Sequence, residues 1–411
     1  MTSDPTTTSS PGPSGPDFKA LYRKLEVTLD RIERTEDVSK LLSIVLKYLV
    51  RNFKDDLGFV GGRLYERDGD EFILKVRHGR AIEAKPGYRV PAGYTAMRRV
   101  LEEGLLIMRE GDPGFDERIE GAVGVSKFAA IAVGEEKRHI LSFTIKGKIL
   151  REHILYSLNA VRHVINLRLR QQQFTDVMVE ARTIQESLLP AAPPAFEGFD
   201  IDGRSRPTEV VGGDLFDYLP LSPHLLGVAI ADASGHGLPA ALLARDVITG
   251  LRMGMAEDLK IIKAVERLNR VIHRSALSSK FVSLFYGEVE PNGNFLYCNA
   301  GHNPPLLRKP GSFRELTQGG LVLGPNPEAR YERGYVQMTS GSMVVMYTDG
   351  VTEREDPAGK QFGLPRLRNV IRRADFASAR EVVDLIFAAT DEFAAGAHQR
   401  DDMTVVVVRK V

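Results

Sequence analysis

The stretch Val228-Ala-Ile-Ala-Asp-Ala-Ser-Gly-His-Gly237 joins a short apolar run to an aspartate and a glycine turn. A run of this kind predicts a buried strand, and the residues at its end lie at the rim of the core, where a loop can present a charge. Asp232 is that charge. The apolar segment from Leu238-Pro239 to Arg252 predicts a helix, because a proline is tolerated in the first turn, where its missing N–H is not needed. This order of elements makes a functional site if other charges converge on Asp232.

Composition excludes several classes of protein. The chain has 411 residues, 43% hydrophobic and 27% charged, which is typical of a soluble globular protein of two domains. A formal net charge of +1 gives no reason to expect nucleic acid or an anionic membrane as partner. The single cysteine, Cys298, excludes an internal disulfide framework and indicates a reducing, cytoplasmic compartment. No apolar run is long enough to predict a membrane span, and residues 1–17, rich in Ser, Thr, Pro and Gly, predict a disordered tail.

The first half of the chain has an α+β pattern, in which helical spacing of apolar residues alternates with hairpin signals. The predicted elements are two helices within 18–52, a hairpin of 59–65 and 71–77 around Arg67-Asp-Gly-Asp70, a helix over 94–103 and a hairpin of 127–133 and 139–146.

This pattern resembles a GAF domain over about residues 36–169, and the segment Val90–Gly104 looks like the helix-before-strand segment of that family. We therefore expect a GAF-like sensory domain over residues 18–148. His78 and His139 lie beside turns without a partner at metal-ligand spacing, and we expect both to be surface histidines.

Residues 149–190 predict a long helical linker. Leu167, Phe174, Val177, Ala181, Ile184 and Leu188 follow one another at spacings of 7, 3, 4, 3 and 4, which is an a/d seam. Such a seam must be buried, either in a parallel homodimer or against the chain's own domains, and the sequence leaves both alternatives open. Pro190-Ala-Ala-Pro-Pro194 ends the helix and marks a domain boundary.

Residues 191–411 alternate short apolar strands with helices. Consecutive strands are joined by short turns, such as Pro291-Asn-Gly293, and the helices come in consecutive pairs. The pattern therefore predicts a layered α/β domain with antiparallel sheets and argues against a doubly wound parallel fold. The predicted strands are 199–206, 226–231, 281–289, 295–298, 304–308, 342–347 and 403–408, and the predicted helices are 238–252 and 259–276.

Three further aspartates stand, like Asp232, at the end or start of an apolar strand: Asp214, Asp349 and Asp401. A single aspartate in such a place is ordinarily a turn or capping residue. Four aspartates beside strands that must be central in a sheet call for another interpretation, because like charges at one sheet edge repel one another unless a cation holds them. Carboxylates without cysteine or adjacent histidine select Mg²⁺ or Mn²⁺. Two such ions can activate water and clamp an in-line phosphoryl displacement, so no protein nucleophile is required.

Five motifs in order resemble those of the PPM metal-dependent serine/threonine protein phosphatases, in the bacterial RsbU/SpoIIE branch. They are Val-Gly-Gly-Asp-Leu-Phe-Asp (211–217), Asp-Ala-Ser-Gly-His-Gly (232–237), Asn-Ala-Gly-His-Asn-Pro-Pro (299–305), Tyr-Thr-Asp-Gly-Val (347–351) and Asp-Asp-Met-Thr (401–404). The resemblance implies an αββα sandwich over 191–411 with a dinuclear Mn²⁺ or Mg²⁺ centre between two β-sheets.

The resemblance also implies roles for individual residues. Asp214 matches the ligand of the first motif, Asp232 the aspartate that bridges both metals, and the backbone carbonyl of Ala233 the next ligand. Asp349 and Asp401 match the ligands that complete the second metal. For Asp217 and Asp402, hydrogen bonding is as good an interpretation as direct ligation.

His236 is a candidate general acid, because a nearby histidine is proposed for this role in the eukaryotic branch of the family. The motif here has extra residues between aspartate and histidine, so the alternative, a histidine that fixes the glycine turn, stays open. His302 is interpreted as structural. The eukaryotic branch also binds the substrate phosphate with an arginine, and no motif assigns Arg204 or Arg206 to this role.

The resulting hypothesis is a cytoplasmic phosphoserine/phosphothreonine protein phosphatase regulated by the N-terminal domain through the linker. The resemblance implies a phosphorylated anti-sigma-factor antagonist as substrate. Ile184 and Leu188 of the seam are expected to be regulatory, and the helices after Asp232 to move with the regulation. The rival hypotheses are a catalytically silent partner-binding module and a two-metal phosphodiesterase of small nucleotides.

Overall fold

The computed structural model describes Arg23 and residues 38–411, apart from 80–83, 135–136, 257–259, 276–279, 310 and 375–377. The chain divides into two compact units, Met1–Thr175 and Asp176–Val411. The predicted N-terminal tail and the first predicted helix lie outside the described residues, except for Arg23. None of the helices in the described part of the chain has both the length and the apolar character needed to cross a bilayer.

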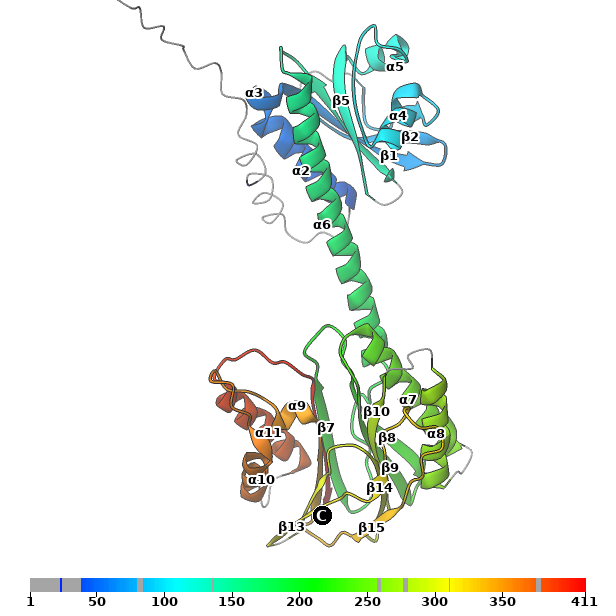
Figure 1. The fold of residues 1–411 in the computed structure, drawn as a ribbon, viewed down its shortest axis with the longest axis vertical. Helices are drawn as coiled ribbons and strands as arrows, with labels where there is room; N and C mark the ends of the chain where they lie inside the picture. Colours follow the sequence, from blue (N-terminus) through cyan, green and yellow to red (C-terminus); the bar gives the residue numbers. More distant parts are fainter. Residues whose placement is uncertain are drawn as a thin grey trace, which may run out of the picture. The chain divides into compact units, whose positions relative to one another are not determined.

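The N-terminal unit is an antiparallel sheet with helices on both faces (Figure 1). The six strands lie in the order β3-β2-β1-β6-β5-β4. Its elements are α2 (Val38–Asn52), α3 (Lys54–Leu57), β1 (Phe59–Asp68), β2 (Glu71–Gly79), β3 (Arg89–Pro91), α4 (Thr95–Glu103), β4 (Leu105–Arg109), α5 (Glu117–Ala122), β5 (Lys127–Val133), β6 (His139–Ile145) and α6 (Arg151–Glu186).

Alternation along the strands gives this sheet two apolar faces. One packs against α2 and α6, as Leu141 and Phe143 of β6 do, and the other packs against α4 and the segment around α5, as Ile140 does. The fold is consistent with the GAF-like domain expected from the sequence. The prediction that His139 is a surface residue was wrong: its exposed fraction is 6%, because β6 is a central strand covered on both faces.

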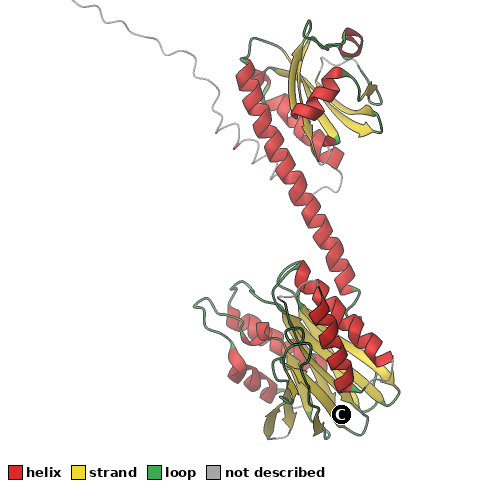
Figure 2. Ribbon diagram, turned by 45° about the vertical axis from the view of Figure 1, so that its right-hand side comes forward, coloured by secondary structure: helices red, strands yellow, loops and turns green. Residues whose placement is uncertain are grey.

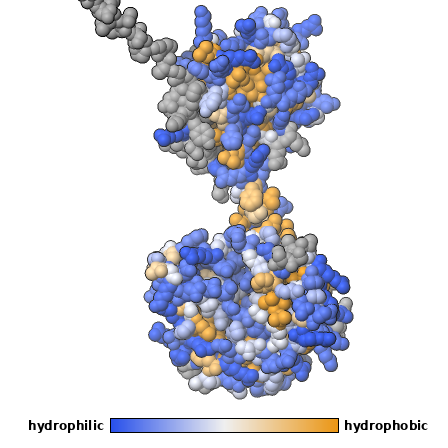
Figure 3. Space-filling model, in the orientation of Figure 1, coloured by the Kyte–Doolittle hydropathy of each residue, from blue (hydrophilic) through white to orange (hydrophobic). Residues whose placement is uncertain are grey.

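Helix α6 runs without interruption from the N-terminal unit into the C-terminal unit, and the division between the units falls within it. Its first half buries a stripe that includes Ile154, Leu158 and Ile165 in the N-terminal core. Most of the predicted seam is exposed in this chain, and Figure 3 shows apolar surface on this helix. The exposed members of the seam are Leu167, Phe174, Val177 and Ile184. Leu188, just beyond the helix, is partly buried against the C-terminal core.

The C-terminal unit contains β7 (Phe199–Arg206), β8 (Asp214–Ser222), β9 (Leu225–Ala233), α7 (Leu238–Ala256), α8 (Ile261–Arg274), β10 (Val282–Val289), β11 (Asn294–Ala300), β12 (Leu306–Lys309), β13 (Ser312–Glu315), β14 (Gly319–Gly320), β15 (Gly334–Gln337), β16 (Met343–Tyr347), α9 (Asp349–Thr352), α10 (Gly363–Arg373), α11 (Ala379–Ala394) and β17 (Met403–Lys410).

These elements form four layers, helix–sheet–sheet–helix (Figure 2). One sheet has the order β14-β11-β10-β9-β8, with β15 beside β11, and the other has the order β13-β12-β16-β17-β7. An apolar core lies between the sheets, α7 and α8 cover the first sheet, and α10 and α11 cover the second. The predicted αββα sandwich with antiparallel sheets is therefore confirmed.

Several boundaries follow from the sequence and others do not. Strand β7 spans the predicted residues, and β9, β10, β16 and β17 agree with prediction to within a few residues. No helix was predicted between Tyr347 and Met403, where α9, α10 and α11 lie. These helices are amphipathic, with a mostly polar outer face, so their apolar signal is weaker than that of the strands.

Candidate metal centre

The centre of the candidate site is a row of residues at one end of the first sheet. Asp214 on β8 lies directly opposite Asp232 on β9, and Asp232 lies opposite Ser283 on β10. Alternation places these three side chains on the same face as Phe216 and Ile230, which belong to the core between the sheets. The row therefore opens into the end of the inter-sheet space.

The second sheet contributes Thr348, which ties the two sheets together at this end. Its hydroxyl donates to Asp214 Oδ2 at 2.7 Å and accepts from the Thr404 N–H at 2.9 Å. Thr348 and Thr404 are fully buried. Asp214 lies on β8, and the two threonines lie in or directly beside strands of the other sheet. These hydrogen bonds therefore fix the Asp214 carboxylate relative to both sheets.

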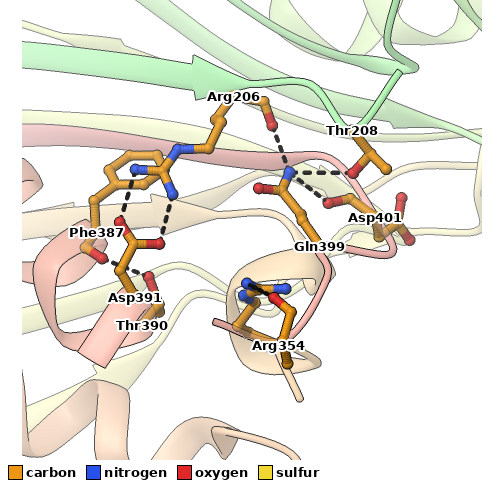
Figure 4. A network of polar contacts seen from close by, with 9 residues as sticks. Arg206, Thr208, Arg354, Phe387, Thr390, Asp391, Gln399 and Asp401 are labelled. Carbon is orange, nitrogen blue, oxygen red and sulfur yellow. Dashed lines mark hydrogen bonds and ion pairs between the residues drawn. The ribbon is translucent and has the colours of Figure 1, made fainter. Parts of the chain in front are cut away.

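Asp349 and Asp401 follow on the same edge of the second sheet. Asp349 begins α9, immediately after Thr348, and is half-buried, whereas Asp401 lies two residues before the start of β17 and is exposed. Gln399 holds the chain at Asp401: its side-chain amide donates to the carbonyl of Asp401, the carbonyl of Arg206 and the hydroxyl of Thr208 (Figure 4). The position of Asp401 is therefore set by the backbone of the neighbouring strand.

Two glycines allow this close packing. A Cβ on Gly213 would lie 2.7 Å from the carbonyl oxygen of Ala233, and a Cβ on Gly350 would lie within 2.0 Å of the carbonyl oxygen of Asp402. Both distances are shorter than any side chain tolerates. The glycine in each motif therefore lets a backbone approach next to a candidate carboxylate.

The carboxylates raise one another's pKa. Burial and the charges of Asp349 and Asp401 raise the pKa of Asp232 to about 7. Burial and the charge of Asp401 raise the pKa of Asp349 to about 6. Burial, followed by the charge of Asp232, raises the pKa of Asp214 well above its usual range. The four aspartates proposed as ligands therefore form one electrostatic cluster, and a cation would relieve its mutual repulsion.

Asp217 and Asp402 serve other contacts. Asp217 is almost fully buried in a bidentate ion pair with Arg252 of α7, with distances of 2.8 and 3.2 Å. The two oxygens of Asp402 accept from the N–H groups of Thr208 and Gly213 at 2.7 and 2.6 Å. These two aspartates anchor the strand and the loop that carry Asp214, which agrees with the hydrogen-bonding interpretation.

Gln185 was not selected by any motif or pattern in the sequence. Its side-chain amide donates to the carbonyl of Gly212 at 2.6 Å and accepts from the N–H of the same residue at 3.1 Å. Nearby, Arg252 also donates to the carbonyl of Leu188 at 3.0 Å. The chain at the end of α6 is thus linked directly to Gly212 and, through Arg252, to Asp217. These two residues lie on either side of Asp214 in the sequence. A glutamine on a polar helix carries no sequence signal for such a contact.

The two histidines differ in environment. His236 is 83% exposed by side chain, and its Nδ1 lies 2.7 Å from Glu209 Oε1. His302 is 5% exposed, and its Nδ1 lies 2.8 Å from the hydroxyl of Ser283. Burial lowers the pKa of His302 to about 4, so this ring is neutral at physiological pH.

Several other candidates lie away from the cluster. Arg204 pairs with Asp384 of α11, and Arg206 pairs bidentately with Asp391 of the same helix (Figure 4). Cys298 is buried in the core beneath α7 and α8.

The donor set matches the chemistry of a hard divalent cation. All candidate ligands are oxygen atoms, which suits Mg²⁺ or Mn²⁺. Among the described residues, no three His, Cys, Asp or Glu side chains are compact enough to enclose an ion by themselves. A site of this kind fits ions that keep several water ligands, as Mg²⁺ does.

The C-terminal unit has the fold of a PP2C-type phosphatase domain. The solved structure of the SiaA-PP2C domain of Pseudomonas aeruginosa matches 58% of this chain and 98% of its own, with a TM-score of 0.52 and 21% identity, and so supports the fold. The family description "Stage II sporulation protein E (SpoIIE)" matches residues 222–411. The C-terminal unit is therefore similar to the SpoIIE family over these residues.

Two curated relatives extend the match. Phosphoserine phosphatase RsbU of Bacillus subtilis is 29% identical over 59% of this chain and 73% of its own length. Protein IcfG of Synechocystis is 26% identical over 63% of this chain, but the match covers only 45% of that relative. The matches to this family and to these relatives agree with the resemblance inferred from the five motifs.

Proposed function

We propose that the C-terminal unit is a metal-dependent phosphatase of phosphoserine and phosphothreonine in a protein substrate. The observation that carries this proposal is the convergence of carboxylates from two sheets at one end of the sandwich. The names of the relatives support the reaction, since RsbU is named a phosphoserine phosphatase.

Two Mn²⁺ or Mg²⁺ ions per site are the proposed cofactor. Asp214, Asp232 and the carbonyl of Ala233 are the residues of the first sheet that would hold them, and Asp232 is the proposed shared ligand. Asp349 and Asp401 are the proposed ligands from the second. When bound, the ions would supply the charge and the activated water for in-line displacement at phosphorus. The chain's own contribution is to hold five oxygen donors in place through Thr348, Gln399 and Asp402.

His236 is proposed as the group that donates a proton to the leaving oxygen. It lies four residues after Asp232, is open to solvent, and its Nδ1 lies 2.7 Å from Glu209 Oε1. A histidine must reach the leaving group in the substrate complex to act in this way. The exposed position of His236 leaves it free to do so.

The proposed substrate is a phosphorylated anti-sigma-factor antagonist, and the proposed compartment is the cytoplasm. The substrate rests on the resemblance to the RsbU/SpoIIE branch. The N-terminal unit is proposed as a GAF-like sensory domain over 18–148, followed by a linker over 149–190 and the phosphatase domain over 191–411.

A comparison of wild type with Asp349→Asn tests the reaction. Both are assayed with Mn²⁺ on a phosphoserine protein and on a cyclic nucleotide, with EDTA as the metal-free control. Wild type is expected to release phosphate from the phosphoprotein and to leave the cyclic nucleotide intact, and the variant to act on neither. Opening of the cyclic nucleotide to its nucleoside monophosphate, without action on the phosphoprotein, would favour the phosphodiesterase. No reaction with either substrate but retained binding of the phosphoprotein would favour the silent binding module.

Regulation is proposed to pass through α6. The contacts of Gln185 with Gly212 and of Arg252 with Leu188 and Asp217 support this, because a shift at the end of the helix would move the backbone on both sides of Asp214. The exposed seam residues, with Ile184 at 56% exposure, support a homodimer through the linker. Ile184 and Leu188 are the proposed regulatory residues.

A further inference from the structure

The two proposed ligands of the second sheet come from segments that are far apart in the sequence. We call residues 349–355 the Asp349 segment and residues 397–401 the Asp401 segment. The charge of Asp401 is one cause of the raised pKa of Asp349, so the two carboxylates lie close enough to repel each other. Contacts between the two segments therefore have to hold them together against this repulsion.

The Asp349 segment is tightly hydrogen-bonded within itself. The carbonyl oxygen of Asp349 accepts from the Glu353 N–H at 2.7 Å and from the Thr352 hydroxyl at 3.1 Å, which closes the single turn of α9. Next along the chain, the carbonyl oxygen of Arg354 accepts at 2.8 Å from the N–H of Phe362, a buried core residue. The backbone of Arg354 is thus anchored to the core one helical turn after Asp349.

The side chain of Arg354 reaches the Asp401 segment. Its Nη2 donates to the carbonyl oxygen of Ala397 at 2.6 Å (Figure 4). Two residues further on, the side chain of Gln399 donates to the carbonyl of Asp401 at 2.9 Å. Hydrogen bonds therefore connect Arg354, through a short length of backbone, with the residue that carries the second carboxylate.

A second contact between the segments lies next to the first in the sequence. Glu355 follows Arg354, Arg400 precedes Asp401, and Glu355 Oε2 lies 2.7 Å from Arg400 Nη1. The Arg400 side chain is 76% exposed, so solvent screens this ion pair and weakens it. Its geometric role is still distinct. One contact would let the segments pivot about it, whereas two contacts at different points also restrain their relative rotation.

From these contacts we infer that Arg354 is a positioning residue, which holds the Asp401 segment against the Asp349 segment at the spacing that a shared cation needs. The Glu355–Arg400 pair supports it. This inference rests on the proposed metal-dependent function. Removal of a residue that orients metal ligands typically lowers metal affinity about 10–100-fold. Because Arg354 binds a backbone carbonyl, it acts on the ligands through the chain, and the lower end of this range is expected.

The test is Mn²⁺ titration by calorimetry of the full-length wild type, Arg354→Met and Arg354→Lys. Arg354→Met, which has no donor, is expected to bind Mn²⁺ about tenfold more weakly. Arg354→Lys should recover most of the affinity, since the contact is a single hydrogen bond. Arg366→Met is the matched control, because Arg366 also donates to backbone carbonyls, but to those of Gln361 and Phe362, at 3.2 and 2.8 Å. Its affinity is expected to equal that of wild type.

The outcomes distinguish the inference from the function beneath it. If wild type binds no Mn²⁺, the proposed function fails and the inference with it. If wild type binds and Arg354→Met binds equally well, only the inference is overturned. Equal weakening in Arg354→Met and Arg354→Lys, or in Arg354→Met and Arg366→Met, would also overturn it, because the hydrogen bond to the Asp401 segment would not be responsible.

Glu355→Gln keeps the inference testable if Arg354→Met does not fold. This change removes the charge of a supporting side chain at the edge of the Asp349 segment and leaves the core untouched. Mn²⁺ affinity is expected to fall about two- to threefold, as suits a partly exposed ion pair. In that case an affinity equal to that of wild type would overturn the inference.

Discussion

Both units of this protein bury charge, and they do so in opposite ways. In the N-terminal unit, Arg63 of β1 is 2% exposed and lies 3.6 Å from the carboxylate of Glu120 on α5. Arg63 also donates to the hydroxyl of Ser142, and the hydroxyl of Tyr94 donates to Glu120. The charges of opposite sign are thus matched within the chain.

At the candidate metal centre of the C-terminal unit, the charged neighbours of a buried carboxylate have the same sign as the carboxylate. The charges that raise the pKa of Asp232 belong to Asp349, Asp401 and Asp402. An uncompensated cluster of this kind destabilises the folded chain, whereas the Arg63–Glu120 pair is compensated. The difference teaches that buried charge matched inside a protein is structural, while buried charge of one sign indicates a partner from outside.

The largest expected effect is that of Asp232→Asn on turnover. Loss of the proposed bridging ligand removes several kcal/mol of stabilisation of the transition state, so hydrolysis of p-nitrophenyl phosphate in Mn²⁺ is expected to fall by at least about 10³-fold. Asp246→Asn, which changes an aspartate of α7 paired with Arg245, is the matched control and should retain activity. Activity retained by Asp232→Asn would contradict the metal centre.

The next effect is on the stability of the N-terminal unit. Glu120→Leu leaves the Arg63 guanidinium buried without its counter-ion, which is expected to cost about 3–5 kcal/mol of unfolding free energy, measured by urea denaturation of the full chain. The double variant Arg63→Met/Glu120→Leu should recover most of this loss. If the single and double variants were equally destabilised, the charge would not be the cause.

The pH dependence of the metal-free protein gives the third test. The pKa of Asp232 is raised to about 7 and that of Asp349 to about 6, so the folded state binds more protons than the unfolded state in this range. Their contribution to stability is therefore fully present below about pH 4 and is lost as pH rises through 6 and 7. Calorimetry in EDTA should show the melting temperature of the C-terminal unit falling between about pH 5 and 8.

Two additions sharpen the same measurement. Mn²⁺ should reverse the fall, since the cation replaces the protons as the partner of the carboxylates. Asp232→Asn should flatten the profile in EDTA, because a carboxyl whose pKa is raised to about 7 is gone. A melting temperature that rises with pH in EDTA would show that the carboxylates do not govern stability there.

The smallest expected effect concerns the connection between the two units. Ile184→Glu places a charge in the exposed seam of α6 without changing a proposed ligand, and is expected to lower both the dimer fraction and turnover by several-fold. Thr183→Glu adds the same charge at an exposed neighbour outside the seam and should leave both unchanged. Dimer fraction is measured by analytical ultracentrifugation. If Ile184→Glu behaves as wild type does, the two units act independently.

Much of the architecture could be predicted because its signals are local. Apolar runs predicted β7, β9, β10 and β16, and the Asp-Gly turn predicted the first hairpin. The outer helix α10 escaped prediction because it buries only Leu367 and Ile371, whereas α11 buries a broad apolar face at helical spacing that the prediction missed. His139 was misjudged for a related reason: a histidine beside a turn gives no sign that its strand is covered on both faces.

The sequence by itself determined the αββα class and the four candidate aspartates, because strand-end aspartates and glycine turns are properties of short segments. Only the tertiary structure decided which polar residues surround them. Asp217 and Asp402 share the motifs with the proposed ligands, yet their partners are Arg252 and backbone N–H groups. The contacts of Gln185 and Ser283 join residues from separate elements. Such partners are set by packing between sheets and helices, which no local pattern encodes.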